Sequence, residues 1–495
     1  MYIRMLVLLC ISLYTVRIIL KILGFNDYGT YNIVAGILVF FTFINNGLAS
    51  ATKRYITTEI AKNDEGQAIH IFNTCLIAHV IISIVIILLS ETIGLWVINN
   101  ILNIPDNRLI AANWVYQFSL IAVIINILRS PYEAVIIAHE KMNAYALFSI
   151  ADAIFSLLIV YLLQITSGDK LIIYSCLLVG SSLIIACIYI AYCFRQFSIC
   201  KWRYTRDKEL LKEIFNFMSW SLLGQFAVVC TNQGVNILIN TYYSVVVNAA
   251  IGISNQVVNL ANRFVSNFQV AFNPQIIKLY AKQENDSLLK LLYISSKISS
   301  FLIILFFVPI SHELSYILDW WLGKYPPYTI IFCLLTFIAI YIEAISAPLW
   351  MIIYSQSNIK RYQIVISSVY ILNFIFGWIV LALGFPPYYV ILVRILIFCT
   401  LLSIRITFAK RLLTIINIPH WIWEIPIRGI LIACIAYVLT YFCKSLLSNE
   451  NSDILHIIST CILSGILTII LITCIGLNRS ERNLFIKILI KKIKS

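Results

Sequence analysis

The run KLIIYSCLLVGSSLIIACIYIAYCF, residues 170–194, leads directly into RQFSICKWRYTRDKELLK, residues 195–212. The first segment is apolar almost throughout. A helix of about 20 such residues, rising 1.5 Å per residue, crosses the ~30 Å hydrocarbon core of a bilayer. The second segment is short and strongly basic. Because this succession of apolar run and polar loop recurs along the whole chain, we predict an all-α polytopic membrane protein with fourteen transmembrane helices.

The composition agrees with this prediction. Hydrophobic residues make up 61% of the chain, charged residues 12%, and the mean hydropathy is +0.91, which is unlike a soluble enzyme. The net charge of +14 is concentrated in loops and therefore does not indicate a nucleic-acid partner. We expect helices at residues 3–23, 29–50, 71–98, 110–138, 143–164, 170–194, 213–240, 243–272, 289–311, 327–354, 360–383, 388–409, 421–443 and 453–476.

The distribution of Lys and Arg orients the chain. Five of the 36 fall in loops on one side, namely Lys21, Arg108, Lys170, Lys324 and Lys444. Six fall inside predicted helices, namely Arg17, Arg129, Arg263, Lys297, Arg394 and Arg428. The other 25 lie on the side that holds both termini. Cationic loops resist translocation, so we predict that both termini are cytoplasmic.

The 13 cysteines predict no special chemistry. Most lie within predicted helices, with no CxxC motif and no metal-ligand spacing, so we interpret them as small apolar residues. We expect no disulfide framework, no metal and no other cofactor. The first helix is too long for the apolar region of a cleavable signal peptide.

Two segments indicate an internal duplication. SPYEAVIIAHEKMNAYALFSI, from Ser130, and APLWMIIYSQSNIKRYQIVIS, from Ala347, align without a gap when Pro131 is set on Pro348. Two six-helix halves of this kind would be related by an axis along the membrane normal. Chance similarity of apolar sequences is the alternative. A proline inside a helix invites a kink, so both prolines are predicted hinges, with static packing kinks as the alternative.

Polar side chains form stripes along three predicted helices, at steps of mostly three and four residues that keep them on one face. They are Cys10, Tyr14, Arg17 and Lys21 on helix 1; Gln225, Asn232, Asn236 and Asn240 on helix 7; and Asn255, Asn259, Asn262, Ser266, Gln269 and Asn273 on helix 8, with Arg263 beside Asn259. Lipid cannot hydrogen-bond these groups, so they must face protein or water. We interpret them as the wall of a hydrated cavity, with interhelical hydrogen bonding as the alternative for any one of them.

The charged residues inside the predicted helices indicate that the lining of this cavity is positively charged. A charge at mid-bilayer costs about 2.5–3.5 kcal/mol even on the lenient insertion scale, which makes it a functional candidate. Arg17, Arg263 and Lys297 have no obvious local partner, whereas Arg129 has Glu133 one turn away. Guanidinium groups bind phosphate oxygens in a bidentate fork, so the pattern favours an anionic substrate. A structural ion pair is the alternative for each residue.

The opening YIRMLVLLCISLYTVRIILKILGFNDYGTYNIVAGI (2–37), with NNGLASATKRYIT (45–57), resembles the bacterial polysaccharide-biosynthesis transporters. These are the oligosaccharide repeat-unit flippases of the MATE-like MOP superfamily. The stretches ETIGLWVIN, AANWVYQFS, PYEAVIIAHEKM, NQGVNILIN, VSNFQVAFNPQI and LGFPPYYV extend the resemblance over essentially the whole chain. Each is loose alone, but their order is specific. Family members usually carry several residues before YIRM, and often have Arg where Thr231 or Asn232 stands.

The resemblance implies two lobes around a central cationic cavity. The implied parts are an N-lobe at 1–195, a basic cytoplasmic inter-lobe loop at 196–212, a C-lobe at 213–411, helices 13 and 14 at 412–477, and a basic amphipathic cytoplasmic tail at 478–495. The implied substrate is an undecaprenyl-pyrophosphate-linked oligosaccharide, moved across the bacterial cytoplasmic (inner) membrane for O-antigen, capsule or exopolysaccharide synthesis. Implied partners are membrane lipids and glycan polymerase or assembly proteins, with the transporter itself working as a monomer.

Carried over residue by residue, Arg17 and Arg263 would contact the pyrophosphate, with Lys297 and Arg129 as further cations. Tyr14 and the amide and hydroxyl groups of helices 7 and 8 would line the cavity and accept the sugars. Mid-span Asp152 and Glu343 are candidates for ion coupling, with pairing to buried arginines as the alternative.

Two alternative functions would require different features in the sequence. A multidrug exporter of the same superfamily would be expected to place unpaired carboxylates, not arginines, in its cavity. A membrane enzyme should have a large external loop with clustered catalytic residues, whereas the longest external loops expected, 99–109 and 312–326, are short. We therefore predict that the chain is not an enzyme.

Overall fold

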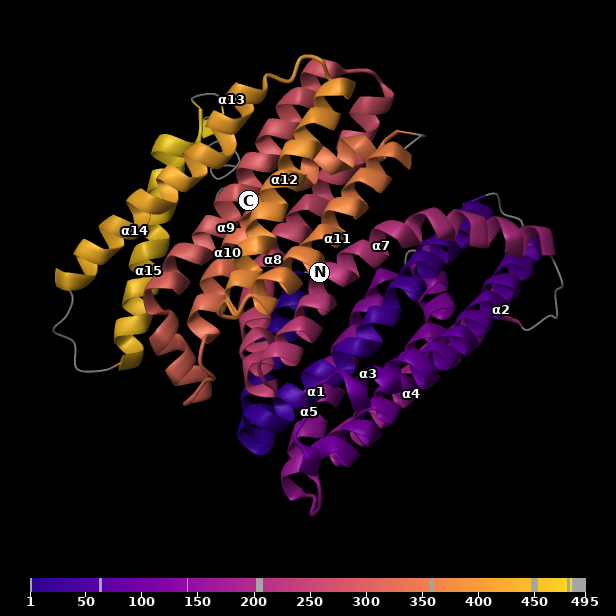
Figure 1. The fold of residues 1–495 in the computed structure, drawn as a ribbon. Coiled ribbons are helices and arrows are strands. Elements are labelled where there is room, and N and C mark those ends of the chain that lie inside the picture. Colours follow the sequence, from indigo (N-terminus) through magenta and orange to yellow (C-terminus); the bar gives the residue numbers. More distant parts are fainter. Residues whose placement is uncertain are drawn as a thin grey trace. The chain divides into compact units, whose positions relative to one another are not determined.

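A computed structural model describes residues 2–61, 65–139, 141–201, 208–356, 360–446, 453–478 and 481–482. Within these ranges the regular structure is helical, with no β-strand (Figure 1). The α-helices are α1 (Tyr2–Ala61), α2 (Glu65–Leu89), α3 (Leu95–Asn100), α4 (Leu109–Ala138), α5 (Met142–Ile165), α6 (Lys170–Gln196), α7 (Lys208–Tyr242), α8 (Val245–Ala281), α9 (Asn285–Leu322), α10 (Thr329–Tyr354), α11 (Lys360–Ala382), α12 (Tyr389–Leu412), α13 (Ile418–Ile422), α14 (Arg428–Leu446) and α15 (Asp453–Leu471).

The long helix α1 is two helices joined at Gly24. The backbone there has φ 74° and ψ 177°, outside the helical region. A Cβ at Gly24 would meet no atom within 4 Å, so the requirement for glycine comes from the positive φ and not from lack of space. The two parts of α1 correspond to predicted helices 1 and 2.

Short π-helical turns complete three other predicted helices. Ser90–Gly94 joins α2 to α3, Trp423–Ile427 joins α13 to α14, and Ile472–Gly476 follows α15. All fourteen predicted helices therefore coincide with helical structure. Ten segments of the described chain are long and apolar enough to cross a bilayer, which supports a multi-pass membrane protein. The count of fourteen spans and the cytoplasmic termini stay predictions.

Two loop predictions were wrong in extent. The loop expected at 312–326 is mostly helix, because α9 continues to Leu322. Within this part of α9, Glu313 is fully buried and its carboxylate lies 2.6 Å from Lys444 Nζ. The basic loop expected at 196–212 is also shorter, because α7 begins at Lys208.

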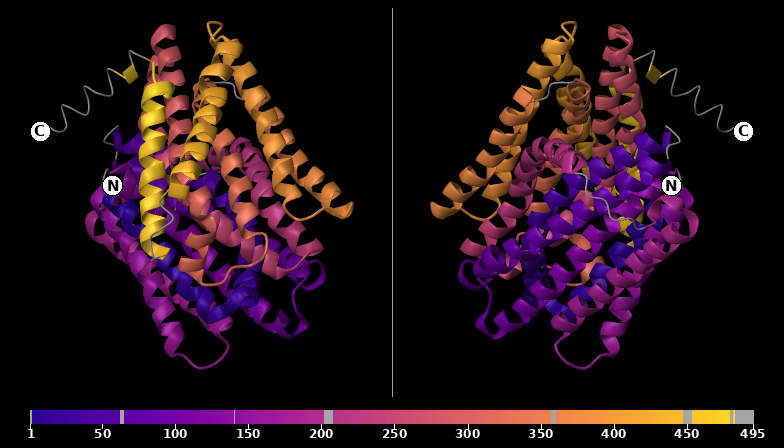
Figure 2. Two further views of the ribbon diagram at one scale, coloured as in Figure 1. Left: turned by 90° about the vertical axis from the view of Figure 1, so that its left-hand side faces the viewer. Right: turned by 90° about the vertical axis from the view of Figure 1, so that its right-hand side faces the viewer.

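The chain forms two compact units. The first unit is Met1–Gly252 with Gln363–Val390, and the second is Ile253–Tyr362 with Ile391–Ser495. In the first unit α1 packs against α4 and α7, and α4 against α6; in the second, α9 packs against α10 and α15 (Figures 1 and 2). These bounds differ from the predicted lobes, which stay a prediction.

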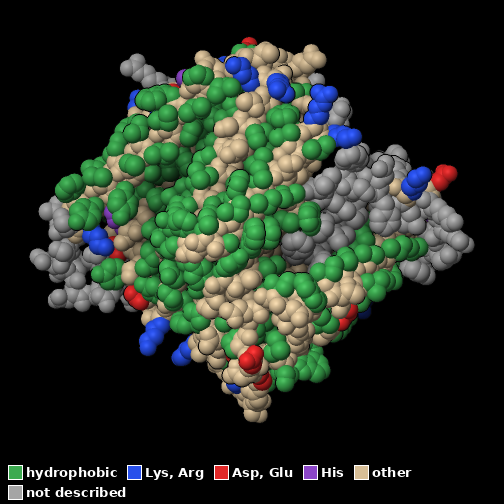
Figure 3. Space-filling view, in the orientation of Figure 1, with side chains coloured by type: hydrophobic (Ala, Val, Ile, Leu, Met, Phe, Trp, Pro, Cys, Tyr) green, Lys and Arg blue, Asp and Glu red, His purple; other side chains and the backbone are tan. Residues whose placement is uncertain are grey.

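Apolar side chains dominate the surface as well as the interior. Large residues such as Leu396, Tyr441 and Phe442 are more than 60% exposed on α12 and α14. The face drawn in Figure 3 is largely hydrophobic, with Lys and Arg toward its edges. Such a surface suits a hydrocarbon solvent, which does not penalise exposed apolar groups.

Candidate functional site

The predicted polar face of helix 1 is a surface stripe of the first unit. Its four members, the α1 stripe, are all exposed: Cys10, Tyr14, Arg17 and Lys21. Ile18 and Ile19, on the other face, are buried. The Tyr14 hydroxyl lies 3.0 Å from that of Tyr161 on α5. Arg17 also interacts with a neighbouring group, so exposure does not leave it without a partner.

The α8 stripe is the corresponding surface of the second unit. Asn259, Arg263 and Ser266 are exposed, whereas Val258 and Val265 are buried in the core of the unit. The exposed residues follow steps of four and three and therefore share one helix face. Because acyl chains offer them no hydrogen bonds, this face requires water, protein or a polar ligand.

The rest of the α8 stripe is less exposed. Asn255 and Asn262 are half-buried, and the Ser266 hydroxyl donates to the Asn262 carbonyl at 2.6 Å. Gln269 instead packs inside its unit, donating 3.0 Å hydrogen bonds to Ser299 Oγ and the Ala344 carbonyl. The C-terminal end of the predicted stripe, near Gln269, therefore holds helices together.

The predicted stripe on α7 divides in the same way. Asn232 is exposed, and half-buried Asn236 donates to Gln233 Oε1 at 2.9 Å. Asn240 is fully buried. The side chain of Gln225 lies outside the described residues. The α7 face is therefore part surface and part packing interface.

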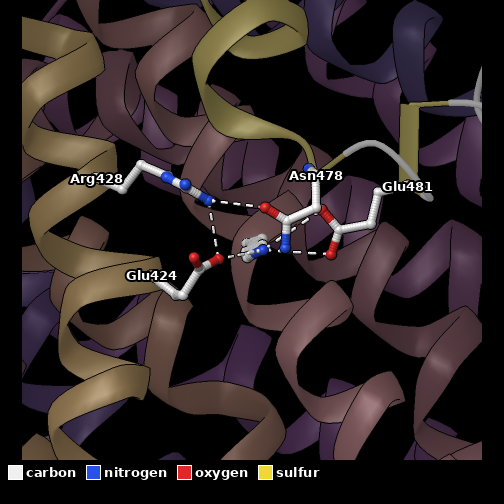
Figure 4. Close-up of polar contacts among 5 residues, drawn as sticks. Glu424, Arg428, Asn478 and Glu481 are labelled. Atoms are coloured by element: carbon white, nitrogen blue, oxygen red, sulfur yellow. Dashed lines mark hydrogen bonds and ion pairs between the residues drawn. The ribbon is translucent and has the colours of Figure 1, made fainter.

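Lys297 differs from the other predicted pyrophosphate contacts. Its side chain is 3% exposed, and its Nζ lies 2.6 Å from Glu424 Oε2 and 3.2 Å from Glu481 Oε1. Arg428 donates to Glu424 at 2.9 Å and to Asn478 Oδ1 at 3.3 Å (Figure 4). Lys297 has no partner on its own helix and pairs with carboxylates of distant segments, which is the structural ion pair stated as the alternative. The cluster holds two cations and two anions, so it is already neutral.

Arg129 belongs to a polar cluster within the first unit. Its guanidinium lies 5.1 Å from the ring centroid of Tyr189, and Asp152 is close enough to interact with its charge. Glu133, expected to neutralise Arg129, lies 3.7 Å from Lys53 Nζ. Helices α1, α4, α5 and α6 each contribute to this cluster.

In the second unit, the other predicted coupling residue lies near a cation. Glu343 on α10 is exposed, and its charge acts on half-buried Arg394 of α12. Buried Arg405 of α12 donates to the Ser346 hydroxyl on α10, a contact that the sequence did not reveal.

The two predicted hinges occupy equivalent places. Pro131 and Pro348 both lie buried inside uninterrupted helices, α4 and α10. The residue two positions before each proline joins its helix to a neighbour through a guanidinium group: Arg129 lies over Tyr189, and Ser346 accepts from Arg405. The internal duplication stays a prediction.

A tether at the predicted outer end was also missed. Arg108 binds Asp27 at 2.5 Å and Asp169 at 2.7 Å, which fixes the turn of α1 to the starts of α4 and α6. These residues lie 81 and 61 positions from Arg108, beyond the reach of any spacing pattern. Among the described residues, no group of three or more His, Cys, Asp or Glu is placed to hold a metal ion.

Comparison with known proteins finds similar folds but no similar sequence. The sequence matches no family profile and no curated protein. A solved structure of the lipid II flippase MurJ, in an inward closed conformation, matches with a TM-score of 0.71 at 13% identity, covering 95% of this chain and 97% of the flippase. The chain has the fold of the MOP superfamily.

Two further MOP structures match over less of the chain. A multidrug resistance MATE family transporter in an inward-facing conformation has a TM-score of 0.64 at 14% identity, with coverages of 82% and 96%. A MOP superfamily transporter from Pyrococcus furiosus, titled for the reverse polarity of its binding pocket, has a TM-score of 0.61 at 12% identity, with coverages of 82% and 94%. The three structures therefore resemble this chain in fold over most of its length.

Proposed function

We propose that this MOP-fold chain flips an undecaprenyl-pyrophosphate-linked oligosaccharide from the cytoplasmic to the outer leaflet of the bacterial cytoplasmic membrane. The observation that carries the proposal is the α8 stripe. Arg263 is exposed in mid-helix beside Asn259 and Ser266, opposite a mostly apolar buried face. In a bilayer such a face needs water, protein or a polar ligand beside it, and a polar ligand is the partner that the proposal assigns.

The stripes match the chemistry of the substrate. Arg17 and Arg263 provide guanidinium groups that bind pyrophosphate oxygens, and charge-assisted hydrogen bonds of this kind contribute about 1.5–3 kcal/mol each. Tyr14, Asn255, Asn259 and Asn262 supply the hydroxyl and amide groups that sugars require. The polyprenyl chain stays in lipid. Lys297 and Arg129, each beside a carboxylate or an aromatic ring, have secondary roles.

Two observations favour a lipid-linked substrate over small-molecule export. The charged members of the α1 and α8 stripes are Arg17, Lys21 and Arg263, all cations, whereas a multidrug exporter of cationic molecules needs exposed carboxylates. In addition, the flippase structure covers 95% of this chain against 82% for the MATE transporter. The difference between these two coverages is about as large as the fraction of the chain in predicted helices 13 and 14, residues 412–477.

The membrane potential supplies a direction. An inside-negative potential provides about 2.3 kcal/mol per elementary charge per 100 mV, which favours outward movement of the anionic headgroup. It also favours inward return of the emptied cationic site. Asp152 and Glu343 are the mid-span carboxylates at which a coupling ion would act.

The direct test is deletion of the gene followed by analysis of lipid-linked oligosaccharides. Cells without the protein should accumulate the oligosaccharide lipid facing the cytoplasm. Wild-type protein should remove the accumulation, and Arg263→Ala or Arg17→Ala should not. Lys282→Ala is the matched control, because the Lys282 side chain is 55% exposed in a surface pair with Glu284 and belongs to neither stripe.

Two results would exclude the proposal. One is deletion without accumulation of any lipid-linked oligosaccharide. The other is full complementation by both Arg variants at wild-type protein levels. Loss of resistance to cationic dyes in the deletion strain, without glycan accumulation, would establish the exporter instead.

A further inference from the structure

The first unit contains a hydrogen-bonded contact between the two predicted six-helix halves, 1–195 and 213–411. Asn103 follows α3 and belongs to the first predicted half. Asn240 and Tyr243 lie at the end of α7 and belong to the second. The Asn103 backbone N–H donates to Asn240 Oδ1 at 2.8 Å, and its side-chain amide donates to the Tyr243 carbonyl at 3.0 Å. The charge distribution predicts that this end of the unit faces outward.

A backbone contact lies at the same end. A Cβ on Gly29 of α1 would stand 2.0 Å from the carbonyl oxygen of Val245, at the start of α8. Only glycine allows this approach, since the obstacle is backbone. About one turn beyond Gly29 on α1, the Asn32 amide lies 2.9 Å from where a Cβ on Gly252 of α8 would stand. The first and second halves of the chain thus meet without a side chain between them.

This contact is polar and incompletely satisfied. Asn240 and Asn248 are 0% and 4% exposed, yet Asn240 Nδ2 and both polar atoms of the Asn248 amide have no hydrogen-bond partner among the described residues. Leaving a buried polar group unpaired costs about 1–3 kcal/mol. Separation of the helices would return these groups to water, and their hydration would partly offset the cost of separating the packed surfaces. An interface with this balance suits reversible opening.

We infer that Gly29, Asn103, Asn240, Tyr243 and Val245 form an outer gate, which is closed in this structure. The two halves must part here before a headgroup leaves on the outer side. The inference rests on the proposed transport function. Its specific content is that the Asn103 hydrogen bonds and the Gly29–Val245 contact hold the closed state.

The test is a reversible crosslink across the gate. Asn103→Cys with Asn240→Cys is joined by a short reducible bis-thiol reagent, and the linked peptide is identified by mass spectrometry. Flipping is measured in proteoliposomes with undecaprenyl-pyrophosphate-linked oligosaccharide isolated from cells that lack the transporter. Wild-type protein treated identically controls for the 13 native cysteines.

Asn99→Cys with Asn113→Cys is the matched pair. These side chains are hydrogen-bonded at 3.1 Å at the same end, but both belong to the first half. We expect flipping to fall in proportion to the linked fraction of the 103–240 pair, to return on reduction, and to be unaffected by the 99–113 link. Unchanged flipping by protein linked between 103 and 240 would overturn the gate.

A second measurement needs no transport. A membrane-impermeant maleimide applied from outside should label Asn240→Cys at least tenfold more slowly than exposed Asn99→Cys. Equal labelling rates would overturn the closed gate. If wild-type protein fails to flip the oligosaccharide lipid, the proposed function fails, and the gate is still judged by this labelling ratio.

Discussion

Lys297 shows how a charge inside a membrane protein is stabilised by residues distant in sequence. Its Nζ contacts Glu424 and Glu481, while Arg428 holds Glu424 from the other side. Removing one member leaves an unbalanced buried charge, and breaking a buried pair typically costs about 3–5 kcal/mol.

We therefore expect Lys297→Met to lower the free energy of unfolding by about 3–5 kcal/mol. Lys297→Met with Glu424→Gln should recover most of that loss, because Arg428 and Glu481 then balance each other. Thermal unfolding of the purified protein checks this. Lys282→Met, in an exposed pair, should change stability by no more than about 0.5 kcal/mol. A wild-type melting temperature for Lys297→Met would show that the network is not a stabilising element.

The partners of Lys297 could not be predicted from the sequence. Spacing along one helix grouped Arg17 and Arg263 with other polar residues on faces that the structure leaves exposed, because periodicity is a property of one segment. Lys297 was placed with them because its partners stand on other segments, one of them 184 residues away. Partners of this kind follow from tertiary packing, which a single sequence does not reveal.

Among the helices, the contact of α1 with α7 and α8 depends on two glycines seven residues apart. A Cβ at Gly29 would collide with the backbone of Val245 at 2.0 Å, whereas a Cβ at Gly36 would lie 3.1 Å from the mobile end of Gln233. The first obstacle is rigid and the second can move.

Gly29→Ala should therefore destabilise the protein by about 1–3 kcal/mol, the usual cost of overpacking, and Gly36→Ala by much less. Gly29→Ala should also speed the external labelling of Asn240→Cys, because relief of the clash opens the gate. Equal melting temperatures for the two variants would contradict the close approach.

The prolines inside α4 and α10, which the sequence predicts to be kinks, make a second prediction at this scale. Replacing Pro131 or Pro348 by Ala restores a backbone hydrogen bond and favours a straight helix, a change of about 3 kcal/mol in helix preference. If the kinks are bending points, Pro131→Ala and Pro348→Ala should slow flipping without lowering the melting temperature. Pro309→Ala, inside α9 and outside the two aligned proline segments, is the control. Wild-type flipping rates in both variants would make the kinks static.

At the scale of the whole molecule, hydropathy and loop charge predicted the helices well, because a bilayer constrains the length and polarity of every span. The break at Gly24 lies between predicted helices 1 and 2, and the π-helical turns lie within predicted helices. The tether from Arg108 to Asp27 and Asp169, and the contacts between Asn103 and α7, were not foreseen. They join ends of helices that hydropathy treats as independent.

The direction of transport is also a property of the whole molecule. The headgroup is anionic and its proposed site is cationic, so an inside-negative potential should raise the initial flipping rate, at about 2.3 kcal/mol per charge per 100 mV across the full membrane. Proteoliposomes with a potassium-valinomycin potential and no proton or sodium gradient test this. A rate that ignores the potential but follows an ion gradient would place the driving force at Asp152 or Glu343.

The central claim is that exposed guanidinium groups on α1 and α8 hold a pyrophosphate. The most direct measurement is the initial rate of flipping of undecaprenyl-pyrophosphate-linked oligosaccharide by purified wild-type protein, Arg17→Ala, Arg263→Ala and Lys282→Ala in proteoliposomes. Loss of a charge-assisted hydrogen bond worth about 1.5–3 kcal/mol should slow each Arg variant by roughly tenfold or more, with Lys282→Ala at the wild-type rate. Wild-type rates in both Arg variants would contradict the claim.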